Sequence, residues 1–225
     1  MIYYFTVNTI IELICFITAL VCLLNDNSRI WRSMIVFLFI TCVTEMAGIY
    51  VKKLYLADRQ HVHPNLWLYN ILLIFQVGFF SLMFYTLLRK YINSKPIIIS
   101  GLALIIVLYN YELFSHGIFL YNELTNTVLL VLCVLYSLFY FFLLLKDERY
   151  IQLKKSAEFW WVAGILFFYF GTTACNLFFD KLHAVVFTSG HYLTYYIYAM
   201  LNIILYSCWS YSFICRKWLI KTSQV

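Results

Sequence analysis

Seven stretches of this sequence are long and apolar enough to cross a lipid bilayer, which constrains the fold more than any other feature. The hydrocarbon core of a bilayer is about 30 Å thick, so that a spanning helix needs roughly 20 apolar residues. Because lipid offers no hydrogen-bond partner to backbone N–H and C=O groups, each stretch is expected to be α-helical. The expected spans are 3–24, 31–51, 65–88, 97–114, 124–145, 158–179 and 192–214, of which the fourth is the shortest.

The composition leaves little of the chain for a soluble part. Of the 225 residues, 64% are hydrophobic and 12% are charged, whereas soluble domains are about half apolar and a quarter charged. The predicted fold is therefore all-α, a polytopic membrane protein that forms a single domain over 1–225 and is surrounded by the lipid bilayer. The apolar runs are continuous and do not alternate in polarity, which argues against a transmembrane β-barrel.

The distribution of lysine and arginine predicts the orientation. Most of them lie in the loops after the first, third and fifth spans and in the C-terminal tail. Because cytoplasmic loops carry an excess of these residues, the N-terminus is expected outside and the C-terminus in the cytoplasm. The loop after the second span, with Lys52, Lys53 and Arg59, is the main exception. The net charge of +6 is thus a topology signal, and no nucleic-acid partner is expected.

Polar and ionisable side chains within the spans are the candidates for a binding site, because burying them in a membrane is costly. Glu12 and Glu45 each lie on a stripe of small or polar residues at helical spacing, which is expected to face the bundle interior. Other polar residues share single faces of later spans. The predicted ligand-binding residues are Glu12, Glu45, Asn70, Gln76, Tyr169, Thr172, Asn176, Tyr198 and Asn202.

With the predicted orientation, these side chains fall in the outer half of the membrane, and the inner halves of the third and fifth spans are rich in phenylalanine. We therefore expect a polar cavity that is open to the outside and closed towards the cytoplasm. If Glu12 and Glu45 share it, one of them should keep a proton, and they should meet or share asparagine or glutamine partners. The alternative for each polar residue is an interhelical hydrogen bond, worth about 0.6 kcal/mol.

Neither a metal site, a cofactor nor an enzymatic activity is predicted. The seven cysteines all lie within spans or at their ends, and none forms a Cys-x-x-Cys pair. The five histidines belong to the outer side, but their spacing does not match a zinc site.

Missing residues argue against several classes of seven-helix protein. Retinal photoreceptors need a lysine in the last span, and here no lysine lies inside a span. G-protein-coupled receptors carry a basic triplet after the third span, which here ends Leu88-Arg89-Lys90. Membrane zinc hydrolases of the ceramidase type need His-x-x-x-His in the last span, where His191 is followed at that offset by Tyr195. Transporters of the PQ-loop type rely on Pro-Gln pairs and interior prolines, which are absent from the spans.

Several segments of the chain resemble small seven-helix inner-membrane proteins of Bacteroidota bacteria. The resemblance is carried by 158–171, with the sequence EFWWVAGILFFYFG, and by 44–48, 69–71, 201–206 and 215–217. It implies the inner (cytoplasmic) membrane and, because some members are thought to be encoded near two-component signalling genes, a sensory role.

The sequence thus predicts a receptor-like or accessory sensory protein. It would bind a small periplasmic ligand or a proton in the outer cavity and signal by helix shifts to a separate cytoplasmic partner. The alternative is a small-solute transporter with a three-plus-one-plus-three helix plan, suggested by a faint similarity between 69–73 and 201–205.

Overall fold

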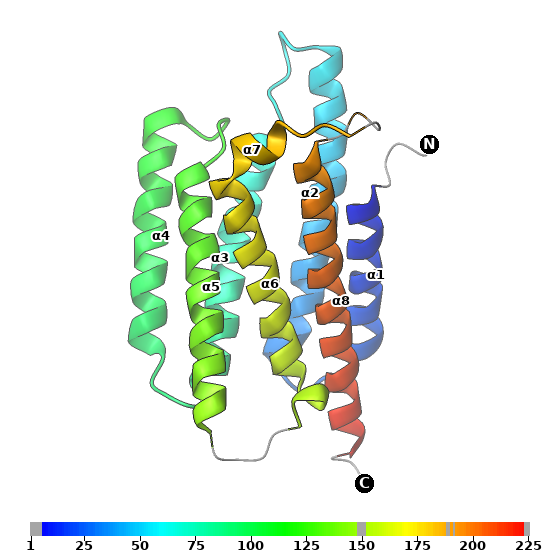
Figure 1. The fold of residues 1–225 in the computed structure, drawn as a ribbon, viewed down its shortest axis with the longest axis vertical. Coiled ribbons are helices and arrows are strands. Elements are labelled where there is room, and N and C mark those ends of the chain that lie inside the picture. The colour runs from blue at the N-terminus through cyan, green and yellow to red at the C-terminus, as the bar shows by residue number, and fades with distance from the viewer. Residues whose placement is uncertain (1–5, 148–151, 188–189, 191, 223–225) are drawn as a thin grey trace.

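The computed structural model describes residues 6–147, 152–187, 190 and 192–222, and these residues are almost entirely helical (Figure 1). Within them, β-structure is limited to one isolated bridge between Val186 and Tyr192. The helices are α1 (Val7–Leu23), α2 (Arg29–Ala57), α3 (Leu66–Leu88), α4 (Lys95–His116), α5 (Glu123–Lys146), the 3-10 turn η2 (Leu153–Lys155), α6 (Ala157–Leu177), α7 (Phe179–His183) and α8 (Leu193–Thr222).

Six of the described helices, α2 to α6 and α8, are long and apolar enough to cross a membrane, and α1 is a shorter apolar helix. The outer surface of the bundle is also apolar, as Val21, Phe114 and Leu145 show with 64%, 86% and 85% exposure. An apolar surface on long apolar helices is typical of contact with lipid. The prediction of an all-α, multi-pass membrane protein in contact with the bilayer is therefore confirmed.

The helix boundaries differ from the expected spans where polar residues continue a helix beyond its apolar run. The fourth span is not the shortest, because α4 extends from Lys95 to His116 over 22 residues, whereas α1 has 17. Likewise α2 continues beyond position 51 to Ala57. Hydropathy marks the part of a helix that suits lipid and does not mark where helical hydrogen bonding stops. Positions 3–5 of the first expected span lie outside the described residues.

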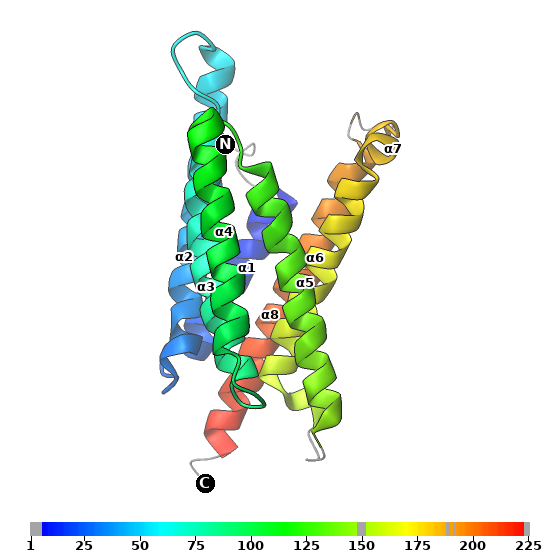
Figure 2. The same ribbon diagram turned by 90° about the vertical axis from the view of Figure 1, so that its left-hand side faces the viewer.

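The helices are arranged as a closed ring in sequence order. Each of α1 to α6 packs on the next long helix, and α8 packs on both α6 and α1. In Figure 2, α2, α3 and α4 diverge from α6 and α8 towards the end of the bundle that carries α7. The α6–α8 contact is especially close, since a Cβ atom on Gly164 would lie 2.9 Å from Cβ of Cys208.

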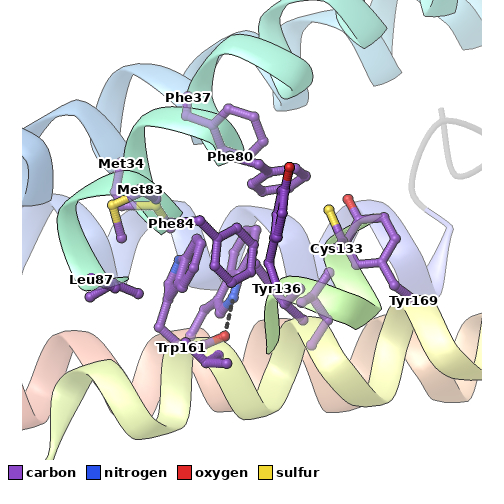
Figure 3. Packing of buried hydrophobic residues seen from close by; sticks show 14 of the residues in the cluster. Met34, Phe37, Phe80, Met83, Phe84, Leu87, Cys133, Tyr136, Trp161 and Tyr169 are labelled. Atoms are coloured by element: carbon purple, nitrogen blue, oxygen red, sulfur yellow. Dashed lines mark hydrogen bonds between the residues drawn. The ribbon is translucent and has the colours of Figure 1, made fainter. Parts of the chain in front are cut away.

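Aromatic and other apolar side chains pack closely around Phe80 and Trp161 in the bundle interior (Figure 3). The rings of Trp161 and Trp209 stack at 6.1 Å, and the Trp209 indole donates a hydrogen bond to the carbonyl of Trp161. Phe80 and Phe84 pack edge-on against Trp161 and are almost fully buried. This packing agrees with the apolar closure expected from the phenylalanines of the third span. Phe142 of α5 does not take part, because 60% of it is exposed on the outer surface.

Candidate functional site

The two buried acids expected from the sequence lie together between α1, α2, α3 and α8. On α1 the buried residues Thr9, Glu12, Cys15 and Ala19 recur at helical spacing, so that Glu12 faces the bundle interior with 4% exposure. Glu45 of α2 is half-buried and close enough to Glu12 for the two carboxyl groups to interact electrostatically. The expectation that the two acids share one site stays a prediction.

Tyrosines and a cysteine surround this acid pair. The Tyr69 hydroxyl on α3 donates a hydrogen bond of 3.1 Å to Oε2 of Glu45. The Cys42 thiol on α2 interacts with Glu12, and Tyr206 on α8 lies within the field of both acids. The sequence suggested asparagine and glutamine partners instead. On α3, Tyr69 takes the place expected of Asn70, because neighbouring helical residues point about 100° apart.

Asn70 is completely buried and holds the α4–α5 loop. Its amide nitrogen donates to the carbonyls of Ile118 and Leu120, at 2.8 and 2.6 Å, and its Oδ1 accepts from the backbone N–H of Asn122 at 3.1 Å. The loop is fixed at its other side by Glu112, which accepts from the backbone N–H groups of Leu124 and Thr125 at the start of α5. The position of this loop determines where Tyr121 lies.

A second polar region is a cavity of about 520 Å³ at the α7 end of the bundle, between α5, α6, α7 and α8. Small-molecule sites in proteins commonly have volumes of about 300–1,000 Å³. The Tyr198 hydroxyl donates a hydrogen bond of 2.8 Å to Oδ1 of Asn176 at its rim. Thr172 lines the cavity, and its hydroxyl is buried without a hydrogen-bond partner among the described residues. The lining residues are Tyr121, Glu123, Asn126, Thr127, Thr172, Asn176, Phe179 and Tyr198.

Tyr121 connects the acid pair with this cavity. It interacts electrostatically with Tyr69, the partner of Glu45, and with Tyr198 across the cavity. Burial raises the pKa of Tyr121 to about 12, and the nearby carboxylates of Glu123 and Glu112 add to the effect. Tyr121 is therefore a neutral hydroxyl at physiological pH, able to donate and accept a hydrogen bond.

The other predicted residues lie beside these two regions. Gln76 is half-buried on α3, on the same face as Tyr69 and two turns further along the helix. Tyr169 is buried and packs edge-on against Phe80 at 5.6 Å. Asn202 donates its amide to the carbonyl of Tyr198, one turn back in the same helix, at 3.0 Å. The structure thus divides the nine predicted residues between an acid pair, a cavity, a loop anchor and flanking positions.

Sequence reasoning missed Tyr69, Tyr121, Glu123 and Asn126. Tyr69 lies seven residues before Gln76, and that helical spacing was a usable signal for a shared face. Tyr121 and Glu123 belong to a loop and to a helix start, where only the fold shows that they face a cavity.

His191, considered above for zinc chemistry, lies outside the described residues. Within the described part, no group of three or more His, Cys, Asp or Glu side chains could hold a metal ion.

The end of the bundle away from α7 contains a buried ion pair that was not anticipated. Asp26, in the loop between α1 and α2, accepts hydrogen bonds from Nε and Nη2 of Arg216 on α8, at 2.7 and 3.2 Å. The Arg216 guanidinium also lies over the ring of Trp31. At the same end, Lys90 and Glu158 form an ion pair between the end of α3 and the start of α6.

Comparison with known proteins finds no matching family model, no similar curated protein and no similar solved structure.

Proposed function

We propose that the chain is a seven-helix, receptor-like or accessory sensory protein of the inner membrane, with its N-terminus outside and its C-terminus in the cytoplasm. It binds a small periplasmic ligand in the α5–α8 cavity, or a proton, and signals to a separate cytoplasmic partner. The observation that carries the proposal is the contrast along the bundle axis. A polar cavity of about 520 Å³ lies at the α7 end, and stacked tryptophans and phenylalanines pack between α2, α3, α6 and α8 towards the opposite end.

Two features support seven spans in this orientation. Helix α1 packs between α2 and α8, and its 17 residues extend over roughly 25 Å, close to the thickness of the hydrocarbon core. The loops at the end away from α7 carry most of the lysines and arginines, as cytoplasmic loops do. The exceptional lysines at positions 52 and 53 belong to the last turns of α2, which rise above the neighbouring helices (Figure 1).

The packed aromatic core of the bundle favours the sensor over the transporter. A transporter needs access to its site from both sides in turn, whereas the aromatic core here is packed from Phe37 through Phe80 to Trp209. The similarity between 69–73 and 201–205 suggested a transporter, and it aligns Asn70 with Asn202. The two asparagines have different roles in the structure, which does not support a repeat. Asn70 anchors a distant loop, whereas Asn202 bonds within its own helix.

Cysteine labelling tests the number and direction of the spans. In a cysteine-free background, Thr6→Cys and Val186→Cys should react with a membrane-impermeant maleimide in intact spheroplasts. Asn93→Cys and Gln152→Cys should react only after the membrane is opened. All four side chains are exposed in the structure, so burial does not limit their access. Protection of Thr6→Cys together with Asn93→Cys would remove α1 from the set of spans, and the reverse overall pattern would invert the orientation.

A ligand screen tests the cavity. Purified protein in lipid nanodiscs is heated with each member of a library of small polar metabolites, and unfolding is followed by tryptophan fluorescence. A true ligand at 100 times its Kd should stabilise the protein by about 2.7 kcal/mol. Thr172→Leu, which replaces the unpaired hydroxyl, should abolish that stabilisation.

Thr173→Leu is the matched control for this screen, because Thr173 is the next residue on α6 and its hydroxyl bonds the carbonyl of Tyr169. It should retain the ligand-dependent shift. A shift that survives Thr172→Leu would place the ligand elsewhere, and transport of the same compound into proteoliposomes would favour the alternative function.

A further inference from the structure

Helix α1 directs two acceptor oxygens into the bundle that have no donor. Oδ1 of Asn8 and Oε1 of Glu12 are both buried without a hydrogen-bond partner among the described residues. The two residues are four positions apart, so that their Cβ atoms lie about 5–6 Å from each other on one helix face. An ionised carboxylate and an amide oxygen both only accept hydrogen bonds. Leaving two such buried atoms unsatisfied is unfavourable, and more so for a charged group.

The groups that face Glu12 supply no positive charge to offset this cost. On α2 they are Glu45 and Cys42, on α8 Tyr206, on α3 Tyr69, and on α1 itself Cys15. Among the described residues, Glu45 is the charged group that acts on Glu12, and its effect is repulsive. Two carboxyl groups that interact in a low-dielectric interior do not both ionise.

The environments of the two acids differ in a way that decides which one is neutral. Glu45 is half-buried and accepts a hydrogen bond of 3.1 Å from the Tyr69 hydroxyl. Glu12 has 4% exposure and a carboxyl oxygen without a donor. Burying a carboxyl oxygen without a donor disfavours the charged form of the acid.

We propose that Glu12 is a proton-binding site, in which the neutral acid donates its Oε1 hydrogen to Oδ1 of Asn8 while Glu45 carries the single negative charge of the pair. Binding adds one proton to the Glu12 carboxylate and lowers the charge of the pair from two to one, with no other bond formed or broken. The bound proton supplies the hydrogen-bond donor that Oδ1 of Asn8 and Oε1 of Glu12 otherwise lack.

A metal cation would also supply positive charge, but the surroundings suit it poorly. Hard cations such as Na⁺, Mg²⁺ and Ca²⁺ prefer several carboxylate, carbonyl and water oxygens. The groups around Glu12 are thiols and tyrosines in addition to the single second acid. That the proton comes from the outer side rests on the proposed function. The location of the proton on Glu12 does not.

Infrared spectroscopy of the full-length protein in lipid nanodiscs tests the assignment directly. At neutral pH the wild-type protein should show the carbonyl stretching band of a protonated carboxyl group, shifted down in D₂O. Glu12→Gln should remove this band. Glu45→Gln should retain it, because burial alone keeps Glu12 neutral. Asp58→Asn, at an exposed carboxyl outside both polar regions, is the matched control and should leave the band unchanged.

Asn8→Leu provides a test that keeps Glu12 in place. Removing the acceptor should move the band to higher frequency, as expected for a weaker hydrogen bond. Absence of the band in wild-type protein, its persistence in Glu12→Gln, or an unchanged frequency in Asn8→Leu would each overturn the assignment. Loss of the band when sodium chloride replaces choline chloride at equal ionic strength would assign the site to a metal cation and also overturn it. None of these results depends on a ligand for the α5–α8 cavity or on signalling.

Discussion

Replacing Asp26 with alanine should lower the free energy of unfolding by about 3–5 kcal/mol, the usual cost of leaving one member of a buried ion pair without its partner. The Asp26 side chain has 0% exposure, and that of Arg216 has 25%. The carboxylate also accepts the backbone N–H of Ser28 at 2.7 Å, which fixes the loop before α2. Its loss would therefore detach both the α1–α2 loop and the last turns of α8. Reversible unfolding in mixed detergent micelles measures the change.

Asp58→Ala is the control for this measurement. Asp58 pairs with His61 at the surface, where both side chains are at least half exposed, and surface pairs contribute about 0–1 kcal/mol. The double substitution of Asp26 and Arg216 by leucine should recover part of the loss, because no charge is then left buried alone. An effect of Asp26→Ala no larger than that of Asp58→Ala would show that the pair does not tie the two segments together.

Replacing Asn70 with leucine should destabilise the protein by about 3 kcal/mol or more, because three buried backbone groups lose their partner and each costs about 1–3 kcal/mol. These groups are the carbonyls of Ile118 and Leu120 and the N–H of Asn122. The loop between α4 and α5 should become mobile, and Tyr121 should leave the cavity. Hydrogen–deuterium exchange should then rise sharply in residues 118–122, and thermal unfolding should shift to lower temperature.

Asn202→Leu is the matched asparagine substitution. Asn202 bonds only one carbonyl of its own helix among the described contacts, so its loss should cost about 0.6 kcal/mol. It should leave exchange in residues 118–122 unchanged. Equal exchange in this loop for Asn70→Leu and wild-type protein would contradict the role of Asn70 as the loop anchor.

These two anchors lie towards opposite ends of the bundle. Asp26 and Arg216 join the end of α1 to α8, while Asn70 holds the loop that places Tyr121 beside the cavity. Glu12 is on α1, and Tyr206, within its field, is on α8. A change of charge at the acid pair would therefore act on α1 and α8, which the Asp26–Arg216 pair connects at the end away from α7.

The sequence by itself determined the helices and their surroundings. Length and hydropathy are local properties, and the need of every backbone N–H and C=O group for an internal partner in lipid leaves the helix as the solution for each apolar run. Helical spacing also gave the buried face of α1, because Glu12, Cys15 and Ala19 recur on one side whatever packs against them. The same reasoning located Glu45 and the residues Thr172, Asn176 and Tyr198 of the cavity.

Only the tertiary structure decided how the polar residues are shared between sites. Asn70 and Tyr69 are neighbours in the sequence, yet one holds a loop and the other bonds Glu45. Asp26 and Arg216 are 190 positions apart, and nothing local relates them. The physical reason is that lipid provides no hydrophobic force between helices, so that close packing and interhelical hydrogen bonds set the rotation of each helix. That rotation determines which polar side chains meet, and it depends on all the neighbours of a helix at once.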